Sequence, residues 1–584
     1  MLKRGASKSY SVEPIYDPKQ ISAVSNSDHP ASGDIREDAD KKQPLPDYAK
    51  LMEPAKVRKR RYFSLAVICF TAFILALSIS IVMTSAKPYL DLLSFIILNN
   101  SISSFLAINF ISIFLSFLFQ MDPEAGTEFL GLYIASQPLA QLFFSPLMGF
   151  LGNRLGSVRI PTIISTLIMA VGFTFYACIS ALPEPRKWYL FAARFVIGAA
   201  SGTSTLGYSY VASASTVKER TTALSLLQMS KSSAFIIGPL IQAAFASLGD
   251  GQDRPIGNDS HIYWNMYTAP AWLAVLLSLI NIVVLMPFIF TEFYIAKEEG
   301  DYLAARGLKK SSPDEEIVTK MKPDKVALVV CIVITATTQF NFNFIESTAT
   351  LVVIEQLGVT PTRAVVLVGI MYSAAGVYGL FMFGLVGPIS RKVGERIVLM
   401  AGILFAMSGV ICVYPYGGPL PPLKFINETI DELTTVSLSK SWNLLESPSI
   451  EDDFPICYNA TLALTDGAGC PVDIQPWCCE IPAIHSEQLI AGYLLIFTGV
   501  PIAIMMVNVI FSKVLGPYPQ GTWTGLLGAG TAVARILCPL CVTSLYAAFG
   551  MLATCGFLTS VMVVVLVIFA LSFRRLVPYR HAHS

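Results

Sequence analysis

Long apolar runs separated by short polar turns dominate the pattern along this chain. A run of about 20 apolar residues is long enough to cross the hydrocarbon core of a membrane as a helix. The pattern predicts twelve such helices, at about 63–86, 128–150, 160–182, 188–212, 222–248, 266–291, 326–351, 364–388, 397–415, 488–512, 522–548 and 551–573. Because twelve is even, both termini are predicted on one side of the membrane. The basic run Lys56 to Arg61 places that side in the cytosol.

One further apolar run, residues 92–119, does not fit this count. If it crossed the membrane, every later loop would change sides, and the basic loops would contradict the positive-inside rule. We therefore expect it outside the twelve spans. Two interpretations stay open: an added luminal hairpin associated with the membrane, or a translated intron between Leu90 and Met121.

Polar segments divide the chain into two halves of six spans. The predicted domains are a disordered cytosolic tail at 1–61, an N-terminal half at 62–291, a cytosolic linker at 292–325, a C-terminal half at 326–573 that includes a luminal loop at 416–487, and a second cytosolic tail at 574–584. In the first tail, Tyr48 and Leu51 fit a tyrosine-based endolysosomal sorting pattern, for which a clathrin adaptor is the expected partner. The alternative is an arbitrary tyrosine in a polar linker.

The composition supports a membrane protein, because 54% of the 584 residues are apolar, 14% are charged and the mean hydropathy is +0.59. An aqueous core cannot hide that much apolar surface. The chain has no G-x-x-x-x-G-K-[ST] phosphate loop and only five His residues, so neither an ATPase nor a nucleophile–His–acid site is predicted. We expect no enzyme activity, no cofactor and no resident metal. The net charge of +1 gives no reason to expect a nucleic-acid partner.

A short cationic turn, GFLGNRLGSVR, joins the second and third predicted spans. Its glycines let helices approach closely, and its arginines can lie against helix ends. The residues of this predicted gating motif are Gly149, Asn153, Arg154, Gly156 and Arg159, and a second copy after the eighth span supplies Gly387 and Gly394. The spacing resembles the G-x-x-x-D-R-x-G-x-R loop of the major facilitator superfamily, with Asn153 in place of Asp and Arg159 one place late. The alternative is an ordinary basic loop.

Other features also repeat between the halves. Leu226–Leu227 followed by Pro239 recurs 300 residues later as Leu526–Leu527 and Pro539. The resemblance implies an all-α membrane protein whose twelve helices form two pseudo-repeated six-helix halves, with a substrate site between them. Gly238, Pro239 and Pro539 are predicted helix kinks. The first two resemble a weak form of the glycine–proline motif of proton-linked antiporters in this superfamily, and an ordinary membrane-helix kink is the alternative.

Four ionisable residues interrupt the apolar spans, and burying a charge in lipid costs at least a few kcal/mol. They are Arg194 in the fourth span, Lys231 in the fifth, Glu346 in the seventh and Arg535 in the eleventh. Three cations and one carboxylate facing a shared cavity would suit an anionic solute, with Glu346 as the proton carrier if transport is coupled. The alternative is structural pairing, for example of Glu346 with Arg535, or side chains that reach the interface.

The loop at 416–487 carries two N-x-T glycosylation acceptors, Asn427 and Asn459, and a concentration of cysteines. Glycans and disulfides are permitted on the luminal side. The predicted disulfide cysteines are Cys457, Cys470, Cys478 and Cys479, the last two pairing outwards because they are adjacent. A zinc site is the alternative.

Segments such as SKVLGPYPQGTWTGLLGAGTAVARILCPL resemble a lysosomal branch of the superfamily. The resemblance implies an endolysosomal membrane and movement of a small solute or chloride. Our hypothesis is a multi-pass carrier that moves a small anionic solute by alternating access, with proton coupling through Glu346. The alternatives are a chloride channel on the same scaffold and a non-transporting receptor or scaffold. The expected partners are the solute and membrane lipid.

Overall fold

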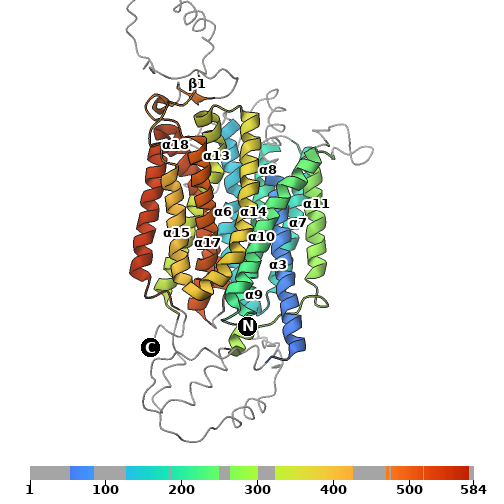
Figure 1. Ribbon diagram of the computed structural model, residues 1–584. Coiled ribbons are helices and arrows are strands. Elements are labelled where there is room, and N and C mark those ends of the chain that lie inside the picture. Colours follow the sequence, from blue (N-terminus) through green and yellow to red (C-terminus); the bar gives the residue numbers. More distant parts are fainter. Residues whose placement is uncertain are drawn as a thin grey trace, which may run out of the picture. The chain divides into compact units, whose positions relative to one another are not determined.

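The computed structural model describes residues 53–83, 126–183, 186–246, 248, 264–299, 323–424, 469–472, 475–516 and 519–577, and these fold almost entirely into long helices (Figure 1). The residues outside these ranges include Tyr48, Leu51, the apolar run 92–119, Asn427, Cys457 and Asn459. The predictions made for those residues therefore stay predictions.

The helices follow the predicted order of spans. Those of the N-terminal half are α3 (Ala55–Met83), α6 (Gly126–Leu155), α7 (Arg159–Ala177), α8 (Arg186–Ala199), α9 (Gly202–Ser213), α10 (Arg220–Ala246) and α11 (Thr268–Val284), with a short 3-10 helix η2 (Ile179–Ala181). Those of the C-terminal half are α13 (Lys325–Leu357), α14 (Pro361–Val393), α15 (Glu395–Cys412), α17 (Ser486–Leu515) and α18 (Gly521–Ser572). A parallel pair of two-residue strands, β1 (Leu423–Lys424) and β2 (Cys470–Pro471), and the 3-10 helix η4 (Pro476–Cys479) lie between α15 and α17.

Nine helical stretches in the described part of the chain are long and apolar enough to cross a membrane. The other three predicted spans correspond to α6, to α8 followed by α9, and to the shorter apolar helix α11. α18 contains the eleventh and twelfth predicted spans, and Gly550, with φ 70° and ψ −168°, breaks its helical backbone between them. The predicted all-α membrane fold is confirmed.

Local sequence explains where these helices start and stop. Asp324 begins α13, because its side chain accepts hydrogen bonds from the backbone N–H groups of Val326 and Ala327. Gly358 ends the same helix in the left-handed region, at φ +62°, where a side chain would be strained. α11 ends at Val284, ahead of Pro287 and earlier than the predicted 291, because a proline cannot donate the backbone hydrogen bond that continues a helix.

A buried ion cluster fixes the start of α3 at the end predicted to be cytosolic. Arg61 is fully buried and pairs with Glu53 at 3.0 Å and with Glu219 at 2.9 Å, and it also donates to the backbone oxygen of Ala214. Burial acts to raise the pKa of Glu219, but hydrogen bonds from Arg61 and Tyr62 and the Arg61 charge outweigh it and lower that pKa. The stabilisation is therefore complete above the ordinary pKa of a glutamate and is lost only as the pH falls through the lowered value.

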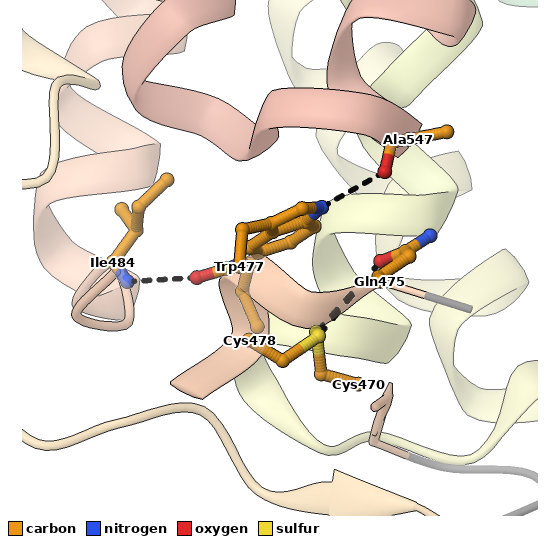
Figure 2. Close-up of a disulfide and its surroundings, with 7 residues drawn as sticks. Cys470, Gln475, Trp477, Cys478, Ile484 and Ala547 are labelled. Carbon is orange, nitrogen blue, oxygen red and sulfur yellow. Dashed lines mark hydrogen bonds between the residues drawn. A yellow bond between two sulfur atoms is a disulfide. The ribbon is translucent and has the colours of Figure 1, made fainter. Parts of the chain in front are cut away.

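The opposite end of α13 is covered by a small cap, which we define as residues 469–472 and 475–485. A disulfide joins Cys470 to Cys478 within it (Figure 2). Cys479 is also disulfide-bonded. Trp477, a residue of the cap, is buried and donates through Nε1 to the backbone oxygen of Ala547 at 3.0 Å. The Trp477 ring lies so close to Gly550 that a Cβ there would come within 2.7 Å of it.

Removing the Cys470–Cys478 disulfide is expected to loosen the cap without unfolding the helices. The bond closes a loop of sequence separation 8, and loop-closure entropy for such a short loop gives about 2.5 kcal/mol of local stabilisation. The double variant Cys470→Ser/Cys478→Ser should show faster amide hydrogen exchange at 475–481 and unchanged exchange in α15. Unchanged exchange at 475–481 would show that Trp477 packing alone holds the cap.

Candidate functional site: a charged cluster and a gate between the two halves

The four predicted ionisable residues, here called the charged cluster, come from both halves of the chain. Arg194 lies on α8 and Lys231 on α10, whereas Glu346 lies on α13 and Arg535 on α18. Arg535 is close enough for its charge to interact with those of Glu346, Arg194 and Lys231. The fold therefore brings together four residues that are distant in the sequence.

Each cation of the charged cluster also contacts neutral polar or aromatic groups. Arg535 donates to the side-chain oxygen of Gln141 on α6 at 3.4 Å, which links the two halves. Lys231 donates to Ser204 at 2.8 Å and lies over the Tyr208 ring, 4.9 Å from its centroid. These neutral partners were not predicted, because nothing in their sequence context separates them from other polar residues in apolar helices.

Arg194 is the most deeply buried cation of the charged cluster, with 7% of its surface exposed. It donates to the hydroxyl of Tyr133 at 3.3 Å and stacks on the same ring at 4.8 Å, while its buried Nε has no hydrogen-bond partner among the described residues. Cation–π contacts of this kind stabilise a buried guanidinium by about 2 kcal/mol or less and do not neutralise it.

Glu346 is the only carboxylate of the charged cluster, so three positive charges face one negative charge and the sum is +2. Within the described ranges Glu346 forms no salt bridge and no hydrogen bond, although its charge acts on Arg535. A net positive, largely buried cluster is costly unless an anion balances it, so the arrangement is suited to binding an anion.

At the end of the helices that is predicted to be cytosolic, the second and eleventh spans meet backbone to backbone. A Cβ on Gly149 of α6 would lie 2.1 Å from the backbone oxygen of Gly521 of α18. Asn153 accepts a hydrogen bond from the Gly521 N–H at 3.0 Å and donates to the Thr522 hydroxyl at 2.9 Å. Gly525, one turn further along α18, also faces α6 closely, since a Cβ there would lie 2.7 Å from the Cα of Pro146. Gly149 and Asn153 of the predicted motif therefore lie on the contact between the halves.

A second contact between the halves lies where α10 meets α14, α15 and α17. Thr221 donates to Glu395 at 2.8 Å, and Lys513 forms an ion pair with the same carboxylate. Buried Arg220 donates to the backbone oxygen of Ser512 at 3.3 Å. Ser225 lies 3.5 Å from the position of a Cβ on Gly387, while Gly394, at φ +103°, ends α14 without such a contact. We call the two contacts together the gate.

The remaining residues of the predicted motif act within the N-terminal half. Arg159 donates to the backbone oxygen of Phe290 at 2.7 Å, and Glu292 accepts the backbone N–H groups of Val158 and Arg159 at the start of α7. Gly156 turns the chain at φ +61°. Arg154 is exposed. Of the predicted kink residues, Gly238 packs against Ser80 of α3, Pro239 lies in α10 and Pro539 lies inside α18.

Replacing Asn153 with Asp is expected to favour the closed gate about fivefold. The carboxylate would face the N-terminus of α18, where the helix dipole and the Gly521 N–H favour negative charge by about 1 kcal/mol. Spin labels at the exposed positions Lys218 and Arg391, one in each half, would report the gate distance. Asn153→Ala, which removes both hydrogen bonds, should shift the distance distribution the other way. An Asp variant that opens the gate would contradict this account of Asn153.

Residues 68–427 match the family model described as Major Facilitator Superfamily. The chain is 30% identical over 553 residues to major facilitator superfamily domain-containing protein 8 of Xenopus laevis, covering 93% of this chain and 98% of that protein. Among solved structures, the human organic anion transporter MFSD10 aligns with a TM-score of 0.57 and 13% identity, over 87% of this chain and 99% of that chain. The proton:xylose symporter XylE aligns with a TM-score of 0.54 and 13% identity, over 89% of this chain and 96% of that chain.

Proposed function

Because this chain belongs to the major facilitator superfamily, a family of membrane transporters, we propose that it carries a small anionic solute across the endolysosomal membrane by alternating access. The single observation that carries this proposal is the charged cluster. Its residues come from both halves, and their formal charges sum to +2. Rocking of one half against the other would expose such a cluster to each side in turn.

The solute is proposed to be an anion because burying the cations of the charged cluster costs free energy. Arg194 is almost fully buried, and the protein groups that contact Arg535 and Lys231, namely Gln141 and Ser204, are neutral. Buried charges without counter-charges cost several kcal/mol each, so a bound anion would recover more energy here than a neutral solute. Glu346 is the carboxylate that can take up a proton as the anion binds, which makes it the proposed proton carrier.

The proposed orientation places the gate in the cytosol and the cap in the lumen. Basic residues gather at the gate end, where Arg391 and Lys392 close α14. The Cys470–Cys478 disulfide in the cap supports an oxidising compartment on the other side. On this orientation Asn427 and Asn459 are luminal glycosylation sites, and both termini are cytosolic. Tyr48 and Leu51 are then available to a clathrin adaptor.

A chloride channel on the same scaffold is the second candidate, favoured by the excess of cations in the charged cluster. Glu346→Gln separates the two candidates, since it should abolish proton-coupled uptake and leave a chloride conductance intact. Patch-clamp of enlarged lysosomes is the measurement. Chloride currents that follow the chloride gradient and are unchanged in Glu346→Gln would favour the channel.

The proposed function is tested by untargeted metabolite profiling of lysosomes isolated with and without this protein. We expect one or a few anionic solutes to change in amount, with restoration by the wild-type protein and no restoration by Arg535→Gln. Arg391→Gln, which removes an exposed arginine, is the matched control and should restore the wild-type profile. Unchanged anions, or restoration by Arg535→Gln, would contradict the proposal.

A further inference from the structure

Three aromatic rings of the C-terminal half pack edge to face between three of its helices. They belong to Phe342 on α13, Tyr372 on α14 and Phe497 on α17, and these helices contact one another (Figure 1). The centroid of the Phe497 ring lies 5.9 Å from that of Phe342 and 5.9 Å from that of Tyr372, at interplanar angles of 84° and 90°. Edge-to-face pairs are a favoured aromatic geometry, so the rings hold one another in place. We call these three residues the aromatic wall.

The Tyr372 part of the aromatic wall faces the interior of the protein. Along α14 the strongly exposed residues Ile370, Val377 and Phe381 recur at helical spacing and mark the side that faces lipid. Tyr372 lies two residues from Ile370, which places it about 200° around the helix, on the opposite side. It is nevertheless partly exposed. A partly exposed side chain on the protein-facing side of a membrane helix borders open space between the helices.

On α13 the aromatic wall shares one side of the helix with the charged cluster. Gln339, Phe342 and Glu346 follow the spacing i, i+3, i+7, which places them in one row, and all three are partly exposed. The exposed residues Val333 and Leu351 lie on a different side of α13. Phe342 is therefore one helical turn from Glu346, and both face the interior space that Tyr372 borders.

The packing of α18 against α13 places Arg535 on the gate side of the aromatic wall. A Cβ on Gly530 would lie 2.8 Å from Cγ2 of Ile332, and the Cys538 sulfur lies 3.2 Å from the backbone oxygen of Phe340. Because residues 530 to 538 and residues 332 to 340 cover the same length, the two helices run in the same direction and in step. Arg535 lies between these two contacts, and the aromatic wall follows the second contact toward the cap.

The second cation, Lys231, lies on the gate side of Arg535. Lys231 donates to Ser204 at 2.8 Å. The neighbouring residue Thr205 lies 3.1 Å from the position of a Cβ on Gly528, which precedes Arg535 by two turns of α18. Both cations therefore lie on the gate side of the aromatic wall. A solute held between the halves would meet positive charge at one end and aromatic rings at the other.

We propose that the transported solute is an organic anion with an apolar body, whose anionic group binds Arg535 and Lys231 and whose body packs against the aromatic wall. This inference rests on the proposed function, in which the charged cluster binds the solute. It adds the substrate class and three residues, Phe342, Tyr372 and Phe497, that determine specificity. Only Phe497, at 8% exposed, is already buried, so the two partly exposed rings are the surfaces that the solute would cover.

The aromatic wall favours an apolar body over the other bodies that an anion can have. Apolar surface that moves from water onto the rings contributes favourable free energy in proportion to its area. An inorganic anion has no such surface and gains nothing from the rings. A polyhydroxylated anion would place hydroxyl groups against the rings and lose their hydrogen bonds to water. The aromatic wall therefore selects the body of the solute, and the cations select its charge.

The test compares the sodium salts of phenylacetate, acetate and gluconate on the full-length protein in lipid nanodiscs. Each anion carries one carboxylate, but phenylacetate has an aromatic body, acetate has almost no body and gluconate has a polar one. Dissociation constants are taken from the dependence of the melting temperature on ligand concentration. We expect the wild-type protein to bind phenylacetate about tenfold more tightly than acetate or gluconate, or better. Arg535→Gln should bind none of the three.

Variants of the aromatic wall locate the selectivity. Phe342→Ala and Tyr372→Ala should each weaken phenylacetate binding by about tenfold and leave acetate binding unchanged. Phe340→Ala is the matched control, because Phe340 lies two residues from Phe342 on another side of α13, where its ring packs against Phe557 at 6.3 Å. It should keep the wild-type preference. The ratio of the two affinities within one variant is unaffected by a uniform loss of stability, and the wild-type comparison needs no variant at all.

The outcomes separate this inference from the function on which it rests. Equal affinities for the three salts, all lost in Arg535→Gln, would overturn the apolar body and leave the anion site intact. A preference for phenylacetate that persists in both Phe342→Ala and Tyr372→Ala would also overturn the inference, because the body would then lie elsewhere. No stabilisation of the wild-type protein by any of the three salts would overturn both the inference and the anion site.

Discussion

Arg535→Gln is expected to reduce anion uptake at least about 30-fold while the thermal stability of the protein is kept or raised. Removing one partner of a buried charged contact to a ligand costs about 2 kcal/mol or more, which corresponds to about 30-fold. Thermal stability is expected to stay the same or to rise in Arg535→Gln, because Arg535 belongs to a cluster whose charges sum to +2. Neutralising one cation lowers their mutual repulsion in the absence of solute.

Radiolabelled uptake into proteoliposomes and melting temperature in nanodiscs measure the two effects on the same sample. Arg391→Gln controls for the loss of an arginine at an exposed position and should leave both unchanged. If Arg535→Gln transported normally, the charged cluster would not be the solute site. If it instead lost stability and uptake together, Arg535 would be a structural residue linking α18 to Gln141.

Gly149→Leu is expected to hold the gate open and to reduce turnover at least about tenfold with solute binding retained. Even the Cβ of a new side chain would lie 2.1 Å from the Gly521 oxygen and 2.7 Å from the Gly521 carbonyl carbon. Both atoms are backbone, so a rotamer change cannot relieve the clash, and overpacking of this kind costs about 1–3 kcal/mol. That cost falls on the closed gate alone, so one half of the transport cycle becomes unfavourable.

The distance between spin labels at Lys218 and Arg391 should lengthen in Gly149→Leu, and the dissociation constant for the solute should change little. Gly384→Leu is the control, because a Cβ at Gly384 meets no atom within 4 Å. A closed gate and normal turnover in Gly149→Leu would show that α6 and α18 separate little during transport. Lost binding in a folded protein would place Gly149 in the solute site instead.

Sequence and structure agree where the signal is local. Apolar length located the helices, and the predicted break between 548 and 551 is at Gly550. The same reasoning placed the end of α11 too late. The residues after Pro287 continue the apolar pattern of the helix, but they are not helical in the structure. Apolar content predicts what can be buried in a membrane, whereas the backbone decides where the helix stops.

The sequence predicts the charged residues of the candidate site, but it does not predict which residues they contact. Arg535 and Glu346 stand out because an ionisable group in an apolar span is costly. Asn153 stands out in the sequence as a departure from the motif, yet its contacts with Gly521 and Thr522 depend on the packing of α6 against α18. The buried hydroxyl of Tyr493 gives no signal in the sequence, because tyrosine is common in apolar helices and only the fold shows that its hydroxyl has no hydrogen-bond partner among the described residues.

Ligand charge selectivity in the purified protein tests the central claim most directly. Thermal shifts in nanodiscs would be recorded with size-matched anionic, neutral and cationic metabolites, in the wild-type protein, Arg535→Gln and Arg391→Gln. The account predicts stabilisation of the wild-type protein and Arg391→Gln by one or more anions, and no stabilisation of Arg535→Gln by the same anions. Stabilisation by neutral or cationic solutes alone, or an equal anion effect in Arg535→Gln, would contradict an anion site at the charged cluster.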